Sequence, residues 1–225
     1  FGGSGTTADA VVSSNEDGGV KRKFIVVQLP EVLDLNEPTQ KDAAKFCEHI
    51  GRPHNLAEIT KERVRRVIKK LDAEDAGKLD LDGKGKQDRG FRVFKLAESN
   101  FLGWDGAAAK DGDTLGDLLE QTVDHVRQGR SDDDLLYELL LKSGFPLTTK
   151  VESKIIAGKT VHSIADGLML VCLDRALTLE CIRAMADLKP ERVVCLDAGF
   201  ANNDQLKTNA VLTFKSKGVV KFLTV

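Results

Sequence analysis

The chain has 225 residues, of which 41% are hydrophobic and 30% charged, and its 33 basic and 35 acidic residues leave a formal net charge of -2. This length predicts one or two domains with enough apolar residues to bury a core. The near-neutral charge excludes a globally basic nucleic-acid-binding protein, although it is compatible with a local basic surface. No apolar run approaches the roughly 18 residues of a membrane span, and the first residues lack the charged and apolar regions of a signal peptide.

The first 30 residues predict a glycine-rich loop, then a short helix, then a strand. Phe1–Thr7 has no regular pattern, whereas Ala8–Ser13 suits a short helix, which the turn-forming residues Asn15–Gly19 would follow. Phe24–Val27 is an apolar, β-rich run that suits a buried parallel strand, and Pro30 closes it.

The next part of the chain predicts a helix, an exposed segment and a second strand. Residues Ile59–Leu71 predict an amphipathic helix, because apolar side chains recur at i, i+3, i+4 and i+7; these are Val64, Val67, Ile68 and Leu71. Residues 72–90 are charged and glycine-rich, which is typical of an exposed loop or linker. Gly90–Leu96 alternates apolar and polar residues and predicts a half-buried strand.

Two further helices and a hairpin are expected in the middle of the chain. Apolar residues from Leu115 to Val126 mark one helix, and Asp134–Ser143 marks another that ends at Gly144. The segments Val151–Ala157 and Lys159–Ile164 flank Gly158 in the manner of a β-hairpin.

The last 58 residues predict alternating strands and helices. The expected elements are a buried strand at Leu168–Leu173, a helix at Thr178–Leu188, a strand at Arg192–Asp197, a helix capped by Asn203 or Asp204, and a strand at Val219–Val225. Such an order predicts a parallel α/β core. The fold class is therefore α/β, with an incomplete α/β lobe at 1–75, a linker and helical segment at 76–150, and a C-terminal α/β domain with a small, mostly parallel sheet at 151–225.

The cysteines and methionines carry information about the origin of the chain. Cys47, Cys172, Cys181 and Cys195 form no CxxC pair and three lie in apolar runs, which predicts reduced core thiols in a cytosolic protein. The chain begins with Phe1 and its first methionine is Met169, so we expect a fragment, or a processed or trimmed chain.

The loop Gly2–Thr7 is the first candidate binding feature. Glycines allow the backbone to approach a ligand closely, and the amides at the start of a helix favour polar or anionic groups. A phosphate-binding P-loop needs a Lys-Ser/Thr pair after its last glycine, whereas this loop has Thr6 and Thr7, and the GxGxxG spacing is also absent. An artificial glycine-serine linker is the alternative interpretation.

The residues Phe1–Thr7, FGGSGTT, resemble the FxGSGTT motif of N6-adenine DNA methyltransferases, in which it forms the S-adenosylmethionine loop. Further segments resemble the modification (Mod) subunit of type III restriction–modification systems. They follow in order as Phe24–Glu31, Glu58–Arg66, Gly90–Leu96, Ser99–Phe101, Trp104–Asp105, Leu135–Leu141, Lys189–Val194, Leu196–Asp197 and Leu206–Ala210. Together they cover nearly the whole chain and are specific, although each alone would be weak.

This resemblance implies that the first lobe is part of a Rossmann-like methyltransferase domain. It also implies that the catalytic DPPY-like tetrapeptide and the target-recognition region precede the cofactor loop, and so lie before Phe1. The five prolines are never adjacent and the single tyrosine, Tyr137, lies in a leucine-rich helix, so no catalytic residue is assigned to this chain. The parent would methylate adenine in DNA, while this part alone is expected to be inactive and to bind the cofactor weakly or not at all.

The resemblance also implies site residues. Phe1, Gly3, Gly5 and Thr6 would border S-adenosylmethionine, and Gln28 stands where many relatives have an acid that binds the ribose hydroxyls. An amide can both donate and accept there, although an ordinary polar strand end is an equal alternative. Asp9 stands where the family often has histidine and receives no role.

One helix carries a dense group of basic residues, namely Lys61, Arg63, Arg65, Arg66, Lys69 and Lys70. They could contact DNA phosphates, but a solvated face of an amphipathic helix is the favoured alternative. The acidic stretch Asp111–Asp134 should avoid DNA and suits a spacer or a protein contact. The four histidines lack metal-ligand spacing, and no Ser/His/Asp arrangement is indicated.

The resemblance implies double-stranded DNA, a second modification subunit and the restriction (helicase–nuclease) subunit as partners, in the bacterial cytoplasm and without a membrane. The alternative function is non-catalytic. Residues from about 90 onward would then join modification subunits to each other or to the restriction subunit.

Overall fold

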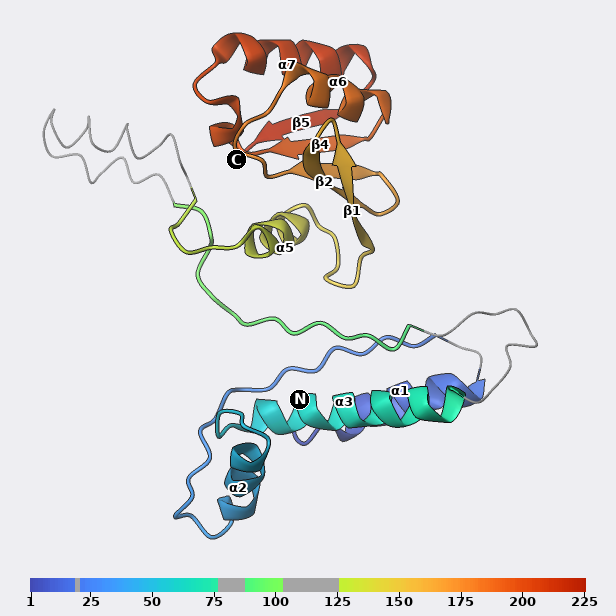
Figure 1. The fold of residues 1–225 in the computed structure, drawn as a ribbon, viewed down its shortest axis with the longest axis vertical. Helices are drawn as coiled ribbons and strands as arrows, with labels where there is room; N and C mark the ends of the chain where they lie inside the picture. Colours follow the sequence, from blue (N-terminus) through green and yellow to red (C-terminus); the bar gives the residue numbers. More distant parts are fainter. Residues whose placement is uncertain (19–20, 77–87, 103–125) are drawn as a thin grey trace, which may run out of the picture. The chain divides into compact units, whose positions relative to one another are not determined.

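The computed structural model describes residues 1–18, 21–76, 88–102 and 126–225 (Figure 1). The chain divides into two compact units, Phe1–Lys95 and Leu96–Val225. The described part of the first unit consists of helices and extended segments, whereas the second unit is built around a β-sheet.

The N-terminal unit contains the helices α1 (Thr6–Gly18), α2 (Lys41–His49) and α3 (Leu56–Asp75). The predicted amphipathic helix is confirmed as α3, which packs along α1. Helix α1 confirms the predicted short helix but continues to Gly18, so the turn predicted from Asn15 is wrong. The Asn15 side chain accepts from the Arg22 N–H and donates to the Arg22 carbonyl, both at 2.9 Å, and thereby fastens the returning chain to the helix.

Neither strand predicted in this unit forms. Residues 24–27 and 90–96 are extended but belong to no ladder, and the side chains of Ile25 and Val27 are 81% and 64% exposed. A strand needs a neighbour for its backbone hydrogen bonds. Since the described residues of this unit contain no strand to pair with, the expected Rossmann-like sheet is not confirmed.

The prediction of an exposed segment at 72–90 is wrong at both ends of that range. Helix α3 continues to Asp75, and the Arg89 side chain is only 5% exposed because it forms ion pairs with Glu16 (2.8 Å), Asp72 (2.7 Å) and Asp75. These carboxylates raise the pKa of Arg89 above its ordinary value, with Glu16 contributing most. Arg89 therefore fastens the end of this segment to α1 and α3.

The C-terminal unit begins with a segment that packs on helix α5 (Asp132–Lys142), which confirms the helix predicted at 134–143. Ser131 caps α5 through a reciprocal capping box with Asp134. The helix predicted from Leu115 lies in 103–125, outside the described residues, and its last member, Val126, instead forms a β-bridge with Phe101.

The sheet of this unit has five strands in the order β1-β2-β3-β4-β5. Their bounds are Val151–Ile156, Lys159–Ile164, Met169–Cys172, Arg192–Cys195 and Lys221–Thr224. The pairs β1·β2 and β2·β3 are antiparallel, while β3·β4 and β4·β5 are parallel. The hairpin and the parallel α/β core are thus confirmed, but the sheet is mixed rather than mostly parallel.

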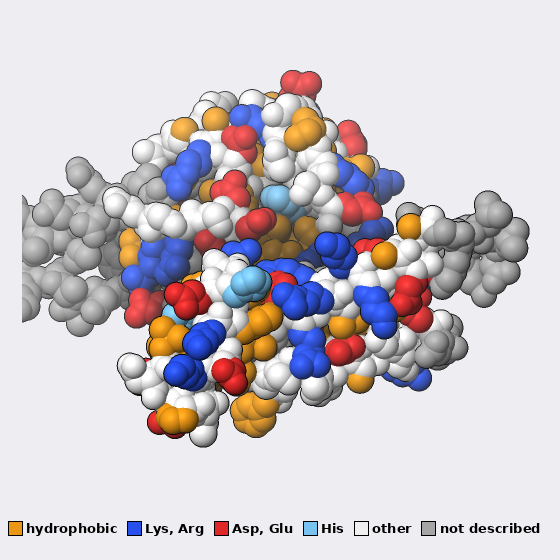
Figure 2. Space-filling model, turned by 60° about the horizontal axis from the view of Figure 1, so that its bottom comes forward, with side chains coloured by type: hydrophobic (Ala, Val, Ile, Leu, Met, Phe, Trp, Pro, Cys, Tyr) orange, Lys and Arg blue, Asp and Glu red, His pale blue; other side chains and the backbone are white. Residues whose placement is uncertain are grey.

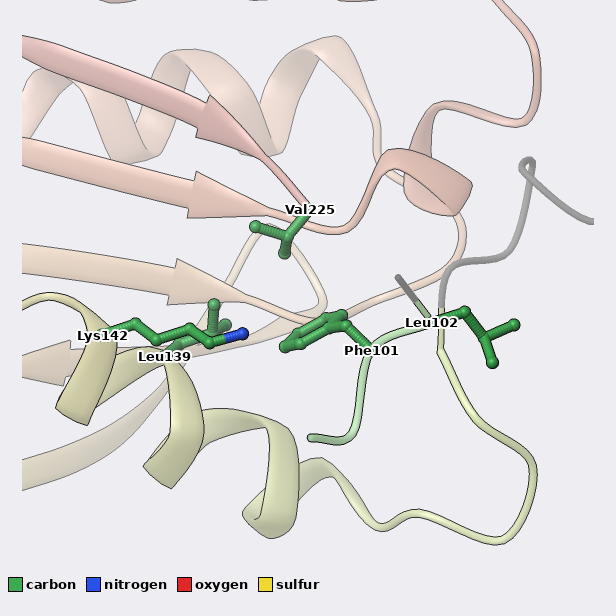
Figure 3. A pocket seen from close by; sticks show the side chains of 5 residues that line it. All are labelled: Phe101, Leu102, Leu139, Lys142 and Val225. Atoms are coloured by element: carbon green, nitrogen blue, oxygen red, sulfur yellow. The ribbon is translucent and has the colours of Figure 1, made fainter. Parts of the chain in front are cut away.

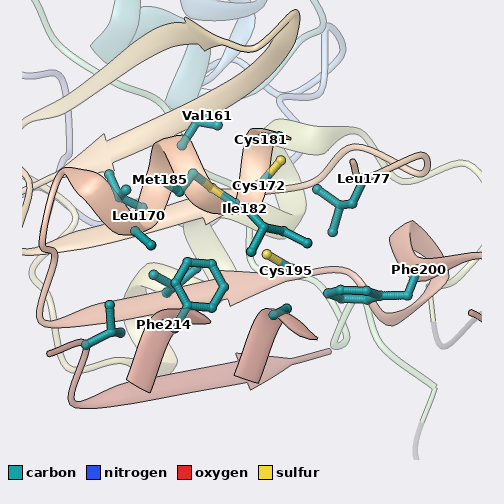
Figure 4. Packing of buried hydrophobic residues seen from close by; sticks show 14 residues of the cluster. Val161, Leu170, Cys172, Leu177, Cys181, Ile182, Met185, Cys195, Phe200 and Phe214 are labelled. Carbon is teal, nitrogen blue, oxygen red and sulfur yellow. The ribbon is translucent and has the colours of Figure 1, made fainter. Parts of the chain in front are cut away.

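Helices cover both faces of this sheet. The connecting helices α6 (Leu179–Asp187) and α7 (Asp204–Ser216) bury Met185 and Phe214 against one face (Figure 4), and Phe214 lies 4.8 Å from Phe222 between ring centroids. The leucines of α5 pack on the other face. All four cysteines are buried as free thiols, as predicted.

Replacing Phe214 tests this core. Phe214→Ala should lower the free energy of unfolding of the C-terminal unit by about 3–5 kcal/mol, because it leaves a cavity beside Phe222. Urea unfolding followed by circular dichroism measures the loss. Val211→Ala on the same helix, where the side chain is 47% exposed, should change it by less than about 0.5 kcal/mol. Equal losses for both variants would contradict the packing described.

Candidate functional site

The glycine loop before α1 is held from two sides. The N–H of Gly2 donates to the Val27 carbonyl at 2.7 Å, and the N–H of Gly3 donates to Oε1 of Gln28 at 2.7 Å. From α3, the Thr60 hydroxyl donates to the Gly3 carbonyl at 2.5 Å. The structure therefore brings Gly3 and Gln28, predicted from distant parts of the sequence, into direct contact.

Gly3 and Gly5 both have a left-handed backbone, but they differ in the space around them. Gly5 has φ +85°, and a Cβ there would lie 3.1 Å from the Thr60 carbonyl oxygen. Gly3 has φ +46°, but a Cβ there would meet no described atom within 4 Å. Gly5 thus permits α3 to approach the loop, whereas Gly3 leaves an open side on it.

The other residues predicted to border a cofactor lie nearby. Thr6 begins α1, and the Phe1 side chain is fully exposed. Because the first amides of a helix have no acceptor within it, Thr6 and Thr7 can donate to a polar ligand. The amides of Gly2, Gly3 and Gly5 already donate inside the loop or to residues 27–28.

Thr60 is a site residue that the sequence analysis missed. It is 5% exposed, and its hydroxyl bonds to the Leu56 carbonyl at 3.2 Å as well as to Gly3. Its place one turn before Val64, on the buried stripe of α3, was the available signal. A hydroxyl in such a stripe must find a partner when it is buried.

The basic residues of α3 are largely neutralised by carboxylates. Lys61 pairs with Glu58, Arg63 with Asp9 (3.7 Å), Arg65 and Arg66 with Glu62 (3.8 and 2.8 Å), and Lys70 with Glu74 (3.8 Å). Arg66 also lies over the Phe46 ring, 5.0 Å from its centroid. Figure 2 accordingly shows Lys and Arg side chains mixed with acidic ones rather than as a continuous basic surface.

A shallow apolar pocket of about 260 Å³ opens on the C-terminal unit (Figure 3). It is lined by Phe101, Leu102, Leu139, Lys142 and Val225. The Lys142 ammonium lies 5.1 Å from the centroid of the Phe101 ring. Apolar walls with a single charged group suit an apolar side chain better than a polar substrate.

The hairpin contains a second contact that the sequence did not indicate. Ser153 and His162 are register partners on β1 and β2, with Oγ and Nδ1 3.0 Å apart. Burial lowers the pKa of His162, while Asp133 and Asp132 at the start of α5 oppose that shift. This cross-strand pair joins an exposed serine on β1 to a histidine on β2 that is only 9% exposed. Among the described residues, no cluster of His, Cys, Asp and Glu is arranged to hold a metal ion, and no helix could cross a membrane.

Comparison with known proteins finds similarity along nearly the whole chain. Over 94% of its length it is 29% identical to the Type III restriction-modification enzyme EcoP15I Mod subunit of Escherichia coli. Over the same share it is 27% identical to the EcoPI Mod subunit of Escherichia phage P1. A shorter match, 31% identical over 43% of the chain, is to the StyLTI Mod subunit of Salmonella typhimurium. The chain spans only 29% and 30% of the first two relatives, and no family model matches it.

The two glycines provide a paired test of the loop. Gly3→Ala should cost only the left-handed backbone, about 1–2 kcal/mol, whereas Gly5→Ala should cost more because its Cβ also meets the Thr60 carbonyl. Hydrogen exchange of the α1 amides, measured by mass spectrometry, should therefore accelerate more in Gly5→Ala. Equal acceleration would show that α3 does not constrain the loop.

His162 makes the stability of the C-terminal unit depend on pH. Its pKa in the folded chain lies below the ordinary value near 6.5, so the fold favours neutral imidazole. The stability it contributes is complete above pH ~6.5 and is lost as the pH falls towards the folded pKa. An NMR titration should show the lowered pKa, and His162→Gln should flatten the pH dependence of the urea midpoint between about pH 7.5 and 5. A pKa at or above 6.5 would contradict this environment.

Proposed function

We propose, from the premise that this chain is related to the modification subunits of type III restriction–modification enzymes, that it is the C-terminal part of a DNA adenine-N6 methyltransferase that uses S-adenosylmethionine. The observation that carries the proposal is the glycine loop at the start of α1, fixed between Gln28 and α3. A flexible glycine-serine linker would have no reason to make these partly buried contacts.

The residues around the loop fit such a cofactor. The first-turn amides of α1, at Thr6 and Thr7, offer donors to its amino-acid end, and the open side of Gly3 leaves room for close approach. Gln28 orients the loop through the Gly3 amide and can address the ribose hydroxyls with its own amide group. Phe1 would border the cofactor. When bound, S-adenosylmethionine supplies the methyl group on its sulfonium.

The reacting adenine would be held by residues outside this chain. A DPPY-like motif before Phe1 would stack on the flipped base and accept from its amino group. Methyl transfer depends mainly on positioning, so the loop contributes by holding the cofactor still. This chain alone is therefore proposed to be inactive.

The extended segment 24–29 supports the proposal that the N-terminal lobe is part of a larger domain with a β-sheet. Ile25, Val27 and Leu29 expose 81%, 64% and 62% of their surface on one side of it, a pattern that suits a strand in a sheet. Neighbouring strands would bury these side chains in the parent protein. Without them the chain should bind the cofactor weakly.

The remaining assignments follow the same proposal. The basic residues of α3 would contact double-stranded DNA after exchanging their internal carboxylate partners for phosphates, which implies modest affinity and a steep salt dependence. A second modification subunit and the restriction subunit are the proposed protein partners, in the bacterial cytoplasm.

One observation favours the alternative role as an interaction module. The C-terminal unit has its own sheet with a core on each face, and it leaves an apolar pocket open beside Phe101. That role is compatible with a methyltransferase parent but needs no cofactor.

Substitutions at Gln28 test cofactor binding in the full-length polypeptide that carries this segment. Gln28→Ala removes the acceptor of the Gly3 amide and should raise the KM for S-adenosylmethionine roughly tenfold. Gln28→Glu keeps the acceptor and should retain the KM. Transfer of tritiated methyl groups to DNA gives both values, with Lys45→Ala, an exposed position on α2, as the control. An unchanged KM in Gln28→Ala would contradict the assignment.

Calorimetry on the 225-residue chain tests the need for further strands. We expect no saturable heat below about 1 mM S-adenosylmethionine, because the loop, although it is held in place, offers only part of the contacts that the cofactor would make in the proposed complete lobe. A micromolar dissociation constant would show that the lobe is complete as it stands.

A further inference from the structure

Three of the four cysteines lie together in the C-terminal unit, and the proposed function uses none of them. Cys172 ends β3 and Cys195 ends β4, and the two are register partners in that parallel pair. Cys181 lies in the first turn of α6, the helix that follows β3. All three belong to one buried cluster that joins the sheet to α6 and α7 (Figure 4), whereas Cys47 lies in the N-terminal unit.

The contacts of Cys172 distinguish its two neighbours. The Cys172 and Cys181 thiols form a hydrogen bond with each other, so the strand cysteine and the helix cysteine are in direct contact. A disulfide needs Cβ atoms about 3.5–4.5 Å apart. Side chains of register partners on neighbouring strands stay at about the strand spacing of 4.7–4.9 Å, which is too wide for Cys172 and Cys195. Cys181 is therefore the better placed partner of Cys172.

The chain between Cys172 and Cys181 is held in place, so their contact is built into the fold. Asp174 forms an ion pair with Lys159 at 3.0 Å. A Cβ at Gly199 would lie 2.5 Å from the Asp174 carbonyl oxygen, which shows how closely the next loop packs against this connection. Thr178 then caps α6 by accepting from the Cys181 N–H at 3.2 Å. These contacts fix the start of α6 over the end of β3.

The two thiols differ in how readily they ionise. The pKa of Cys172 lies below the ordinary value of a thiol, because the Cys181 thiol donates to it and the Asp174 N–H does so as well, although burial opposes this shift. The pKa of Cys181 lies far above that value, because the same hydrogen bond and burial both favour its protonated form. Since the thiolate is the nucleophile, Cys172 should react first and Cys181 should supply the second sulfur.

We infer that Cys172 and Cys181 form a reversible intrachain disulfide when the chain meets a hydroperoxide. The Cys172 thiolate attacks one peroxide oxygen, the O–O bond breaks, and the leaving oxygen takes a proton, which gives a sulfenic acid on Cys172. The Cys181 sulfur then forms the S–S bond and displaces the hydroxyl group, which leaves as water with the Cys181 proton. With hydrogen peroxide, two thiols give one disulfide and two waters, and the sulfurs lose two electrons. A dithiol reverses the reaction by exchange.

An oxidant reaches this pair through the start of α6. Cys172 and Cys181 are fully buried, but hydrogen peroxide is close to water in size. Arg175 and Ala176, which lie between the two cysteines, are exposed, and the end of a helix opens more readily than its middle. The disulfide fastens α6 to β3, so the oxidised unit should open less at this point. The reaction involves neither the cofactor loop nor DNA, and so does not depend on the proposed methyltransferase role.

Peptide mapping of the 225-residue chain after treatment with graded hydrogen peroxide tests the inference. Free thiols are blocked with iodoacetamide in urea before digestion with trypsin, which places each cysteine of the cluster on its own peptide, at 160–175, 176–183 and 193–207. We expect peptide 160–175 to be linked to 176–183, with a mass about 2 Da below their sum, and dithiothreitol should separate them. A link from 160–175 to 193–207 instead would overturn the inference. So would the absence of any link at peroxide concentrations that oxidise the buried Cys47.

Two variants separate the roles of the sulfurs. Cys195→Ala should keep the link, whereas Cys181→Ala should lose it and leave a sulfenic acid on Cys172 that dimedone captures. Hydrogen exchange of the first α6 amides should slow when the wild-type chain is oxidised and should not change in Cys181→Ala. Loss of the link in Cys195→Ala, or equal exchange in the reduced and oxidised wild-type chain, would contradict a bond that joins α6 to β3.

Discussion

The N-terminal unit depends on one close approach, that of the Thr60 turn of α3 to the backbone at Gly3 and Gly5. A single added Cβ at Gly5 would lie 3.1 Å from the Thr60 carbonyl, and the Thr60 hydroxyl bonds to the Gly3 carbonyl from the same helix. This contact fixes where α1 begins, and Gln28 fixes the other side of the loop. The loop is thus preorganised, which is what a binding site needs to retain its affinity.

The elements that the sequence predicted correctly are those with a local signal. The periodicity of α3, the Gly144 stop after α5 and the turn at Gly158 each lie within a few residues, and the structure confirms all three elements. The strand at Phe24–Val27 failed because a strand is a property of a sheet. The segment is indeed apolar, but no described strand of the N-terminal unit pairs with it.

The contacts that escaped prediction join distant residues. Arg89 meets Glu16 across 73 positions, and Thr60 meets Gly3 across 57, so neither partner is visible in a local pattern. The net charge of -2 likewise does not show where the charged residues lie. On α3 most of the basic residues pair with carboxylates of the same unit, and in the C-terminal sheet the ion pairs of Lys150 and Lys154 lie at β1, whereas β5 has Lys221 as its single charged residue. Whether a surface can bind a charged or an apolar partner therefore depends on where the charged residues lie, more than on the net charge of the chain.

The chain is related to type III modification subunits, and its N-terminal unit carries the glycine loop to which we assign S-adenosylmethionine. The most direct test is mass spectrometry of nucleosides from DNA treated with S-adenosylmethionine and the full-length polypeptide that carries this segment. The account predicts N6-methyladenine. Methylated cytosine in its place, or DNA without any transferred methyl group, would contradict it.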